Sequence, residues 1–291
     1  MKHLQTDLAY QHCRKIALGH YENFPVGSLL VPSHKRRYIY SIYAFARYAD
    51  DIADSDSIER SDKHRELAIL ENELSKIEGS GIQEFVPETE LIFIAIADTI
   101  RQLNIPIKEF RDLLSAFRQD SEGKDYQTFD QLIEYSSRSA NPIGHLVLNV
   151  FGYSRNENEE MFRLSDNICT ALQLTNFWQD VSQDLKIGRV YIPEESMITH
   201  NYSHEELKRT NENDDFRSMI RDLCNRTESF FREGEGLPDM TAGRLRLELK
   251  ATLNGGRKIL KKIQELNYNV LNRRPELSAI DKISIMIKAF F

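Results

Sequence analysis

Apolar residues recur at spacings of three and four along almost the whole chain of 291 residues, and only short polar connections interrupt them. This periodicity is typical of amphipathic helices. With 8 Pro and 13 Gly, the composition does not favour a loop-rich β architecture. We therefore predict a single all-α domain over residues 1–291, in which the helices cover residues 5–18, 34–56, 59–78, 88–103, 107–121, 128–138, 142–151, 156–185, 204–233, 239–267 and 275–289.

Two helix starts are predicted from capping-box spacing, in which a Ser is followed three residues later by a Glu. Ser154 with Glu157 and Ser203 with Glu206 have this spacing, so we expect a helix to begin at each. Pro193 lacks the amide hydrogen that a helix interior needs, so the sequence around it is predicted to connect two helices.

The charge and the cysteines restrict the class of protein. A net charge of −7 disfavours a nucleic-acid partner, because such proteins normally present a basic surface to the phosphates. The three cysteines are odd in number and far apart, and they form no CxxC pair, which is typical of reduced thiols in a cytosolic protein. We interpret Cys13, Cys169 and Cys224 as core residues.

Targeting signals are not evident in the sequence. The first twenty residues carry charges throughout and lack the apolar centre and cleavage site of a signal peptide. The longest apolar run, LIFIAIA at residues 91–97, is far shorter than the roughly 20 residues that span a bilayer. We expect a cytoplasmic protein without a transmembrane anchor, for which peripheral membrane contact stays open.

The segment YAFARYADDIADSD, residues 43–56, places four aspartates in a helix that must bury its apolar side. Residues three and four apart share a helix face, so Arg47, Asp50, Asp51 and Asp54 form one stripe. Stacked carboxylates repel each other by roughly 0.2–0.5 kcal/mol per pair on an exposed helix, and by more where water is excluded. We expect a cation to offset this charge; a solvated acidic face is the alternative.

A second polar stripe lies in LQLTNFWQDVSQDLKIGRVYIP, residues 172–193. Gln173, Asn176, Asp180 and Asp184 follow spacings of three, four and four, which puts all four on one helical face. Apolar residues occupy the opposite positions: Leu174, Phe177, Val181 and Leu185. This division predicts one wall of a polar-lined cavity rather than a surface facing bulk water.

The possible ligands in both stripes are oxygen atoms, which suit a hard divalent cation. Mg²⁺ takes one or two carboxylates per ion and shares its remaining positions with waters and substrate phosphates. Zinc is disfavoured because no His or Cys stands at ligand spacing beside either stripe. We therefore predict a diphosphate substrate held through Mg²⁺, with Arg47 and Arg189 near enough in sequence to contact its phosphates.

These motifs resemble those of the squalene and phytoene synthase family of trans-isoprenoid diphosphate synthases. YAFARYADDIAD resembles the first aspartate-rich motif of that family, and residues 172–193 resemble the second. The chain is most similar to the bacterial hydroxysqualene synthases of hopanoid pathways. That narrower resemblance rests on HYENFPVGSLLVP at 20–32, LLSAFRQD at 113–120 and YSSRSANPIGHLVLNVFG at 135–152.

The resemblance implies an all-α isoprenoid synthase fold, with helices around a deep apolar cavity and the aspartates at its mouth. It also implies about two or three Mg²⁺ ions, with Asp50, Asp51, Asp54, Asp180 and Asp184 as ligands. The residues implied to bind or orient the substrate are His20, Asn23, Phe24, Tyr43, Arg47, Gln173, Asn176, Arg189 and Tyr191. Tyr43 and Tyr135 are implied to lie beside the reacting carbons. A simpler role stays open for Phe24, Tyr43 and Tyr135 as core aromatics, and for His20 as a capping or packing residue.

Two departures from the family pattern favour one reaction. Gln179 stands where many condensing relatives have an arginine, and Glu22 stands where some have a lysine. A synthase that joins two prenyl diphosphates must accommodate two diphosphates, whose charge is costly to bury without cations. The missing cations favour a substrate with one diphosphate, and presqualene diphosphate is such a substrate.

The expected reaction converts presqualene diphosphate and water into hydroxysqualene. Magnesium-assisted loss of diphosphate leaves a carbocation, which rearranges before water adds, and either Tyr135 or the amide of Asn141 positions that water. No Gly-rich dinucleotide fingerprint is present, so NADPH is not expected. The enzymes expected to act beside it are a presqualene diphosphate synthase and a hydroxysqualene-reducing enzyme. The alternatives are a condensing synthase that makes presqualene diphosphate, dehydrosqualene or phytoene, and an inactive helical scaffold.

Overall fold

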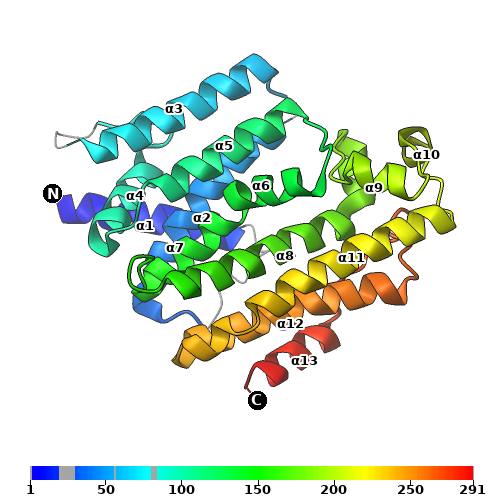
Figure 1. Cartoon of the computed structure of the whole chain (residues 1–291). Helices are drawn as coiled ribbons and strands as arrows, with labels where there is room; N and C mark the ends of the chain where they lie inside the picture. The colour runs from blue at the N-terminus through cyan, green and yellow to red at the C-terminus, as the bar shows by residue number, and fades with distance from the viewer. Residues whose placement is uncertain (1, 20–29, 56, 80–83, 291) are drawn as a thin grey trace. The chain divides into compact units, whose positions relative to one another are not determined.

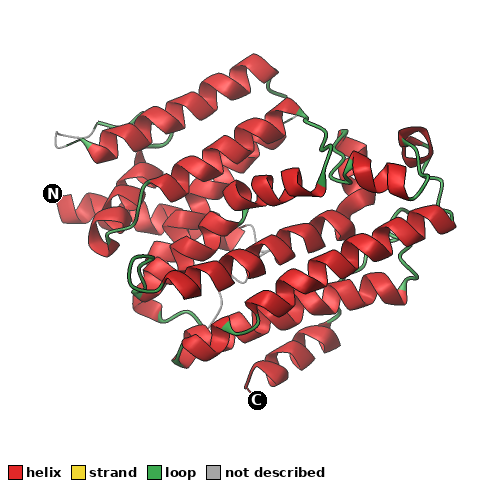
Figure 2. Cartoon of the chain, in the orientation of Figure 1, coloured by secondary structure: helices red, strands yellow, loops and turns green. Residues whose placement is uncertain are grey.

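The structure is a computed structural model that describes residues 2–19, 30–55, 57–79 and 84–290. All regular secondary structure within these ranges is helical (Figure 2), so the predicted all-α class is confirmed. Thirteen α-helices and two 3₁₀-helices are present there: α1 Lys2–Gly19, α2 Ser33–Asp54, α3 Arg60–Glu78, α4 Glu90–Leu103, α5 Lys108–Glu122, α6 Phe129–Ser139, α7 Asn141–Phe151, α8 Glu159–Asp184, η1 Leu185–Ile187, α9 Glu194–Thr199, α10 His204–Lys208, α11 Asp214–Gly234, η2 Leu237–Met240, α12 Gly243–Glu265 and α13 Ala279–Phe290.

The predicted helix over 204–233 is wrong, because the chain forms two helices there. Ser203 begins α10 with the capping box that the spacing predicts. The helix ends after one turn, and Thr210 adopts a left-handed conformation with φ 51° that no α-helix continues. Asn213 then caps α11 by accepting a hydrogen bond from the backbone N–H of Phe216.

The second predicted capping box does not form. Ser154 accepts backbone hydrogen bonds from Glu157 and Asn158 through its carbonyl oxygen, which closes a turn, and α8 begins only at Glu159. The short helix α9, directly after Pro193, was not predicted, because six residues carry too little periodicity to be recognised.

The chain divides into two compact units. The first consists of residues 1–122 and 142–159, and the second of residues 123–141 and 160–291. The first unit therefore contains α1–α5 and most of α7, whereas the second contains α6 and α8–α13 (Figure 1).

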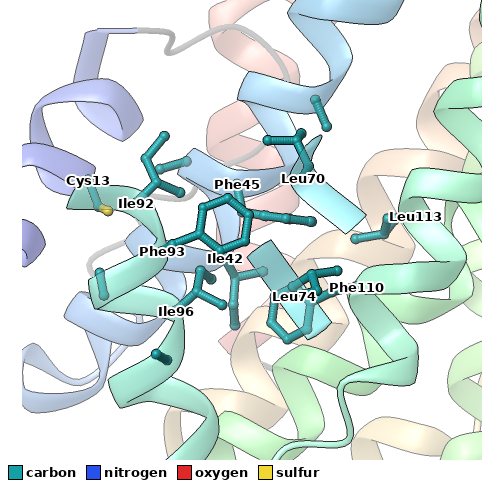
Figure 3. Close-up of a cluster of buried hydrophobic side chains, with 14 of the residues drawn as sticks. Cys13, Ile42, Phe45, Leu70, Leu74, Ile92, Phe93, Ile96, Phe110 and Leu113 are labelled. Carbon is teal, nitrogen blue, oxygen red and sulfur yellow. The ribbon is translucent and has the colours of Figure 1, made fainter. Parts of the chain in front are cut away.

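In the first unit α2 packs against α1, α3, α4 and α5. Aromatic side chains lie where these helices meet (Figure 3), and the ring of Phe45 meets Phe93 and Phe110 edge-on at centroid distances of 5.9 and 5.2 Å. All three are buried, and aromatic pairs in this geometry add to the free energy gained by burying their area. This core fixes α2, the helix that carries the first acidic stripe.

In the second unit α8, α11 and α12 approach closely at glycines. A Cβ atom added at Gly256 of α12 would lie 2.5 Å from the ring of Phe231 in α11 and 2.8 Å from Leu172 in α8. Trp178 of α8 is fully buried and donates a hydrogen bond of 2.8 Å to Oγ1 of Thr227 in α11. These contacts fix α8, which carries the second polar stripe.

The C-terminal helix α13 is held against α12 by one carboxylate. Asp281 accepts hydrogen bonds from the backbone N–H and the hydroxyl of Ser278, and so caps the start of α13. The ammonium groups of Lys258 and Lys262 in α12 lie 3.2 and 2.8 Å from its oxygens. The hydrogen bonds from Lys262 and then Ser278 hold the pKa of Asp281 well below its usual range.

The cysteines only partly match their interpretation as core residues. Cys13 and Cys224 are buried, and burial raises the pKa of each thiol to about 12. Cys169 is half-buried. Among the helices that the structure describes, none has the length and apolar character needed to cross a bilayer.

We predict opposite effects for alanine at two adjacent glycines of α12. Gly256→Ala should destabilise the protein by about 1–3 kcal/mol, because the new methyl group meets Phe231 and Leu172. Gly255→Ala should stabilise it by up to about 1 kcal/mol, since nothing lies within 4 Å and alanine favours the helix. Denaturant unfolding followed by the fluorescence of the single tryptophan, Trp178, measures both. Equal effects of the two substitutions would contradict this account of the packing.

We predict a pH-dependent loss of stability for Asp281→Asn. Its depressed pKa means that the carboxylate stabilises the folded state above the unfolded-state pKa of about 4, and that this contribution falls away below it. The thermal midpoint of the variant should therefore lie below that of the wild type at pH 7, and the gap should narrow as the pH falls below about 4. Asp222→Asn, at an exposed position of α11, is the control. A gap that does not change with pH would reject the role of the charge.

Candidate active site

The first acidic stripe lies in the last turns of α2. Asp50 is half-buried, whereas Asp51 and the final helical residue Asp54 are exposed. The C-terminus of a helix carries a partial negative charge, so carboxylates there are disfavoured by the helix dipole as well as by each other. A segment with these charges at this end of a helix favours a bound cation.

Arg47 supplies part of the compensating charge. Its guanidinium lies 3.5 Å from a carboxylate oxygen of Asp50 and 2.6 Å from one of Asp51. Its Nε is buried and has no hydrogen-bond partner among the described residues. A buried donor without a partner is costly, so this arginine retains the capacity to bind a further acceptor.

Asp50 is the most perturbed carboxyl group of the stripe. Burial is the main cause, and the neighbouring charge of Asp54 adds to it, so that the pKa rises to about 7 even though Arg47 opposes the shift. Asp120 of α5 raises this pKa further, and it is an acidic neighbour that the sequence reasoning did not identify. The side chain of Asp50 is 37% exposed, so solvent and small ions can reach this carboxyl group.

Tyr43 lies one helical turn before Arg47. It is half-buried and packs against the core of the first unit. Burial raises the pKa of its hydroxyl, and the charge of Arg47 opposes that shift. The phenol therefore stays protonated beside the first acidic stripe.

The second stripe has the two faces that its spacing predicts. Leu174, Phe177 and Val181 are buried. On the polar side Asn176 is exposed, whereas Gln173, Asp180 and Asp184 are half-buried. The stripe thus lies at the edge of the packed interior rather than fully in bulk solvent.

The sequence reasoning missed Arg274, which pairs with the second stripe. Its Nε donates to Oδ1 of Asp180 at 2.5 Å, and its second terminal nitrogen donates to Oδ2 at 3.2 Å. Gln179, the residue next to Asp180, donates a hydrogen bond of 2.6 Å to the carbonyl oxygen of Pro275. The connection between α12 and α13 is therefore fastened to α8 at two adjacent residues.

The segment after α8 brings three predicted site residues together. Gly188 has φ +73°, which turns the chain, and the backbone N–H of Arg189 then donates to the carbonyl oxygen of Asp184 at 2.9 Å. Asp184, Arg189 and Tyr191 line one small recess. This recess is much smaller than the deep apolar cavity that the resemblance implies, and the cavity stays a prediction.

Tyr135 and Tyr191 belong to an aromatic group in the second unit. The ring of Tyr191 stacks on Phe177 with centroids 3.9 Å apart and an angle of 11°. Tyr135 lies 6.1 Å from both rings and 5.7 Å from Tyr126, and it is only 3% exposed. Its burial fits the core role that the sequence left open as well as a place in the wall of a substrate site.

Asn141 is buried and held by one specific contact. Its side-chain oxygen accepts a hydrogen bond of 3.1 Å from the hydroxyl of Thr170 in α8. This contact fixes the orientation of the amide. The three remaining predicted residues, His20, Asn23 and Phe24, lie outside the described residues.

The donor chemistry of both stripes fits Mg²⁺. Over residues 2–19, 30–55, 57–79 and 84–290, no three His, Cys, Asp or Glu side chains converge closely enough to hold a metal ion. Mg²⁺ does not require such a cage, because it takes one or two carboxylates and completes its shell with waters and phosphate oxygens. The possible metal ligands in the stripes are carboxylates and amides, which suit this ion.

Comparisons with known proteins agree on one family. The sequence pattern of the squalene/phytoene synthase family matches residues 18–281. A hydroxysqualene synthase of Sinorhizobium fredii is 32% identical over 270 residues, which cover 92% of this chain and 87% of that protein. A 15-cis-phytoene synthase of Synechocystis is 28% identical over 276 residues, 91% and 80% of the two chains. The crystal structure of squalene synthase HpnC from Alicyclobacillus acidocaldarius superposes with a TM-score of 0.83 at 34% identity, covering 91% and 97%.

We predict a measurable coupling between Arg274 and Asp180. Denaturant unfolding of Arg274→Gln, Asp180→Asn and the double variant should give a favourable coupling free energy of about 0.5–1 kcal/mol, since both side chains are partly exposed. The same cycle on Arg163 and Glu160, an exposed pair of α8, should give a smaller value. Additive effects at Arg274 and Asp180 would show that their contact contributes nothing.

Proposed function

Because the chain belongs to the squalene/phytoene synthase family, we propose that it is a hydroxysqualene synthase, which converts presqualene diphosphate and water into hydroxysqualene and diphosphate. Members of this family are isoprenoid synthases, and this chain has their all-α fold. The observation that supports the specific reaction best is the higher identity to the hydroxysqualene synthase than to the phytoene synthase.

The distribution of cations modifies the argument from the sequence. Gln179 is buried and uses its amide to hold Pro275, so it contributes no charge. Arg274, however, places its guanidinium against Asp180, the residue that follows Gln179. The second motif therefore lacks less positive charge than its own residues suggest. The proposal accordingly depends more on the similarity to hydroxysqualene synthases than on the missing cations.

We assign the binding of the diphosphate to the two acidic stripes. Asp50, Asp51, Asp54, Asp180 and Asp184 would hold Mg²⁺, which when bound supplies neutralisation of the charge on the departing diphosphate. The buried, unpartnered Nε of Arg47 supports a direct contact of that residue with a phosphate oxygen. The same site would be lined by the other residues predicted to bind the substrate: His20, Asn23, Phe24, Gln173, Asn176, Arg189 and Tyr191.

The reaction that these residues serve begins with cleavage of a carbon–oxygen bond. Diphosphate leaves with the electron pair, the cyclopropylcarbinyl cation opens to an allylic cation, and the oxygen of water bonds to carbon and releases a proton. Aromatic faces such as those of Tyr43 and Tyr135 would stabilise the cation by roughly 0.5–2 kcal/mol each. Tyr135 and Asn141 are our candidates for holding the water, and Asn141 is already oriented by Thr170.

We further propose that both compact units belong to one synthase domain, because the family match runs through both. We propose a cytoplasmic protein that meets the membrane surface, since its substrate and product are lipids. A presqualene diphosphate synthase would supply the substrate, and an enzyme that reduces hydroxysqualene, as in hopanoid biosynthesis, would consume the product.

A condensing synthase is the second candidate. The similarity to a phytoene synthase over most of both chains and the extra cation Arg274 favour it. The inactive scaffold is disfavoured, because the aspartates of both acidic stripes are intact in this sequence.

The proposed reaction is tested by incubating the purified protein with presqualene diphosphate, with and without Mg²⁺. We expect hydroxysqualene by mass spectrometry, one diphosphate released per product, and no turnover without the metal. A parallel incubation with farnesyl diphosphate should give little product. Efficient formation of presqualene diphosphate, dehydrosqualene or phytoene would overturn the proposal in favour of the condensing synthase.

The assigned aspartates are tested by Asp50→Asn and Asp180→Asn. Each should lower turnover at least about 100-fold, because a magnesium ligand is lost while the shape of the side chain is kept. Asp222→Asn should leave turnover unchanged. Circular dichroism verifies that the variants fold, and wild-type turnover in either folded variant would remove that aspartate from the site.

A further inference from the structure

Helix α13 exposes an apolar face that the fold does not use. Five large side chains form this α13 apolar face, with exposed fractions of 79% for Ile280, 60% for Ile283, 39% for Met286, 55% for Ile287 and 62% for Phe290. They recur at helical spacing on one side of a twelve-residue helix. Contiguous exposed apolar residues of this kind usually mark an interaction site.

The opposite side of the same helix makes the contacts with the fold. Asp281, Ile285 and Ala289 are buried at spacings of four, and Asp281 pairs with Lys258 and Lys262 of α12. In Figure 1 α12 lies between α11 and α13. Because the docked side is fixed by these contacts, the α13 apolar face is directed away from α12.

The stretch of sequence that carries this face is basic although the whole chain is acidic. Residues 243–290, from α12 through α13, contain 11 Lys and Arg against 4 Asp and Glu, whereas the whole chain contains 38 against 45. Lys282 and Lys288 are exposed on α13 itself and flank the apolar side chains. An apolar helix face with flanking lysines is the pattern of a helix that lies in the interface of an anionic membrane.

We propose that the α13 apolar face is a membrane-docking surface, which inserts into the headgroup region of an anionic phospholipid bilayer. The helix is about 18 Å long and lies in the plane of the interface. Pairing of this face with a second copy of the chain is disfavoured, because it would bring the exposed Lys282 and Lys288 of both copies close together. Docking would give the protein access to a lipid substrate, and this benefit rests on the proposed function. Binding of α13 to the membrane does not depend on that function.

The test is co-sedimentation of the full chain with vesicles, without substrate. We expect the wild type to bind equimolar phosphatidylglycerol–phosphatidylcholine vesicles and to bind pure phosphatidylcholine weakly. Ile283→Gln with Ile287→Gln should weaken binding at least about tenfold by removing two inserted side chains. The matched control is Ile198→Gln, at a 67% exposed position of α9, which should bind as the wild type does. Lys282→Gln with Lys288→Gln should reduce the preference for anionic vesicles.

Three results would overturn the docking surface. They are a wild type that does not sediment with anionic vesicles, a double isoleucine variant that binds as well as the wild type, and a wild-type dimer in light scattering that this variant splits into monomers. Turnover of detergent-dissolved presqualene diphosphate separates the two proposals. If both proposals hold, the double isoleucine variant should turn over this substrate as the wild type does. If only the proposed function is wrong, the wild type should show no turnover but should still bind vesicles.

Discussion

Repulsion between carboxylates is the constraint from which the account of this protein follows. Asp50, Asp51 and Asp54 crowd the negative end of α2, and Asp180 and Asp184 follow each other along α8. One arginine offsets part of this charge in each unit, Arg47 in the first and Arg274 in the second. Burial of Asp50 and, after it, the charge of Asp54 raise the pKa of Asp50 to about 7, although Arg47 opposes the shift. A bound cation would offset the repulsion that remains, which is why we infer a cationic ligand for these carboxylates.

Local features of the structure were predictable from the sequence. The helices α2 and α8 and the polar and apolar sides of α8 follow from residue spacing, since burial of one face determines both. The division between α10 and α11 was not predictable in the same way, because Thr210 adopts a positive φ that its residue type does not indicate. At Ser154 the spacing was present, but the backbone formed a turn instead of the cap.

Long-range contacts account for most of what the sequence could not show. Arg274 is 94 residues away from Asp180, and Asp120 comes from a different helix than Asp50, so no local pattern connects them. The same holds for α13, where a helix was predicted over 275–289 but its docked side became evident only through Lys258 and Lys262. A sequence motif shows only its own cations, and Arg274 lies outside the second motif. For this reason Gln179 suggested that more positive charge is missing beside Asp180 than the folded chain in fact lacks.

The most direct test of the central claim is calorimetric titration of inorganic diphosphate into the protein in the presence of Mg²⁺. If the carboxylates of both stripes serve one ligand, the wild type should bind one diphosphate per chain, and Asp50→Asn and Asp180→Asn should each weaken that single event by about tenfold or more. Two results would contradict the account. One is two independent binding events, each of which is lost with only one of the two substitutions, and the other is diphosphate binding that neither substitution changes.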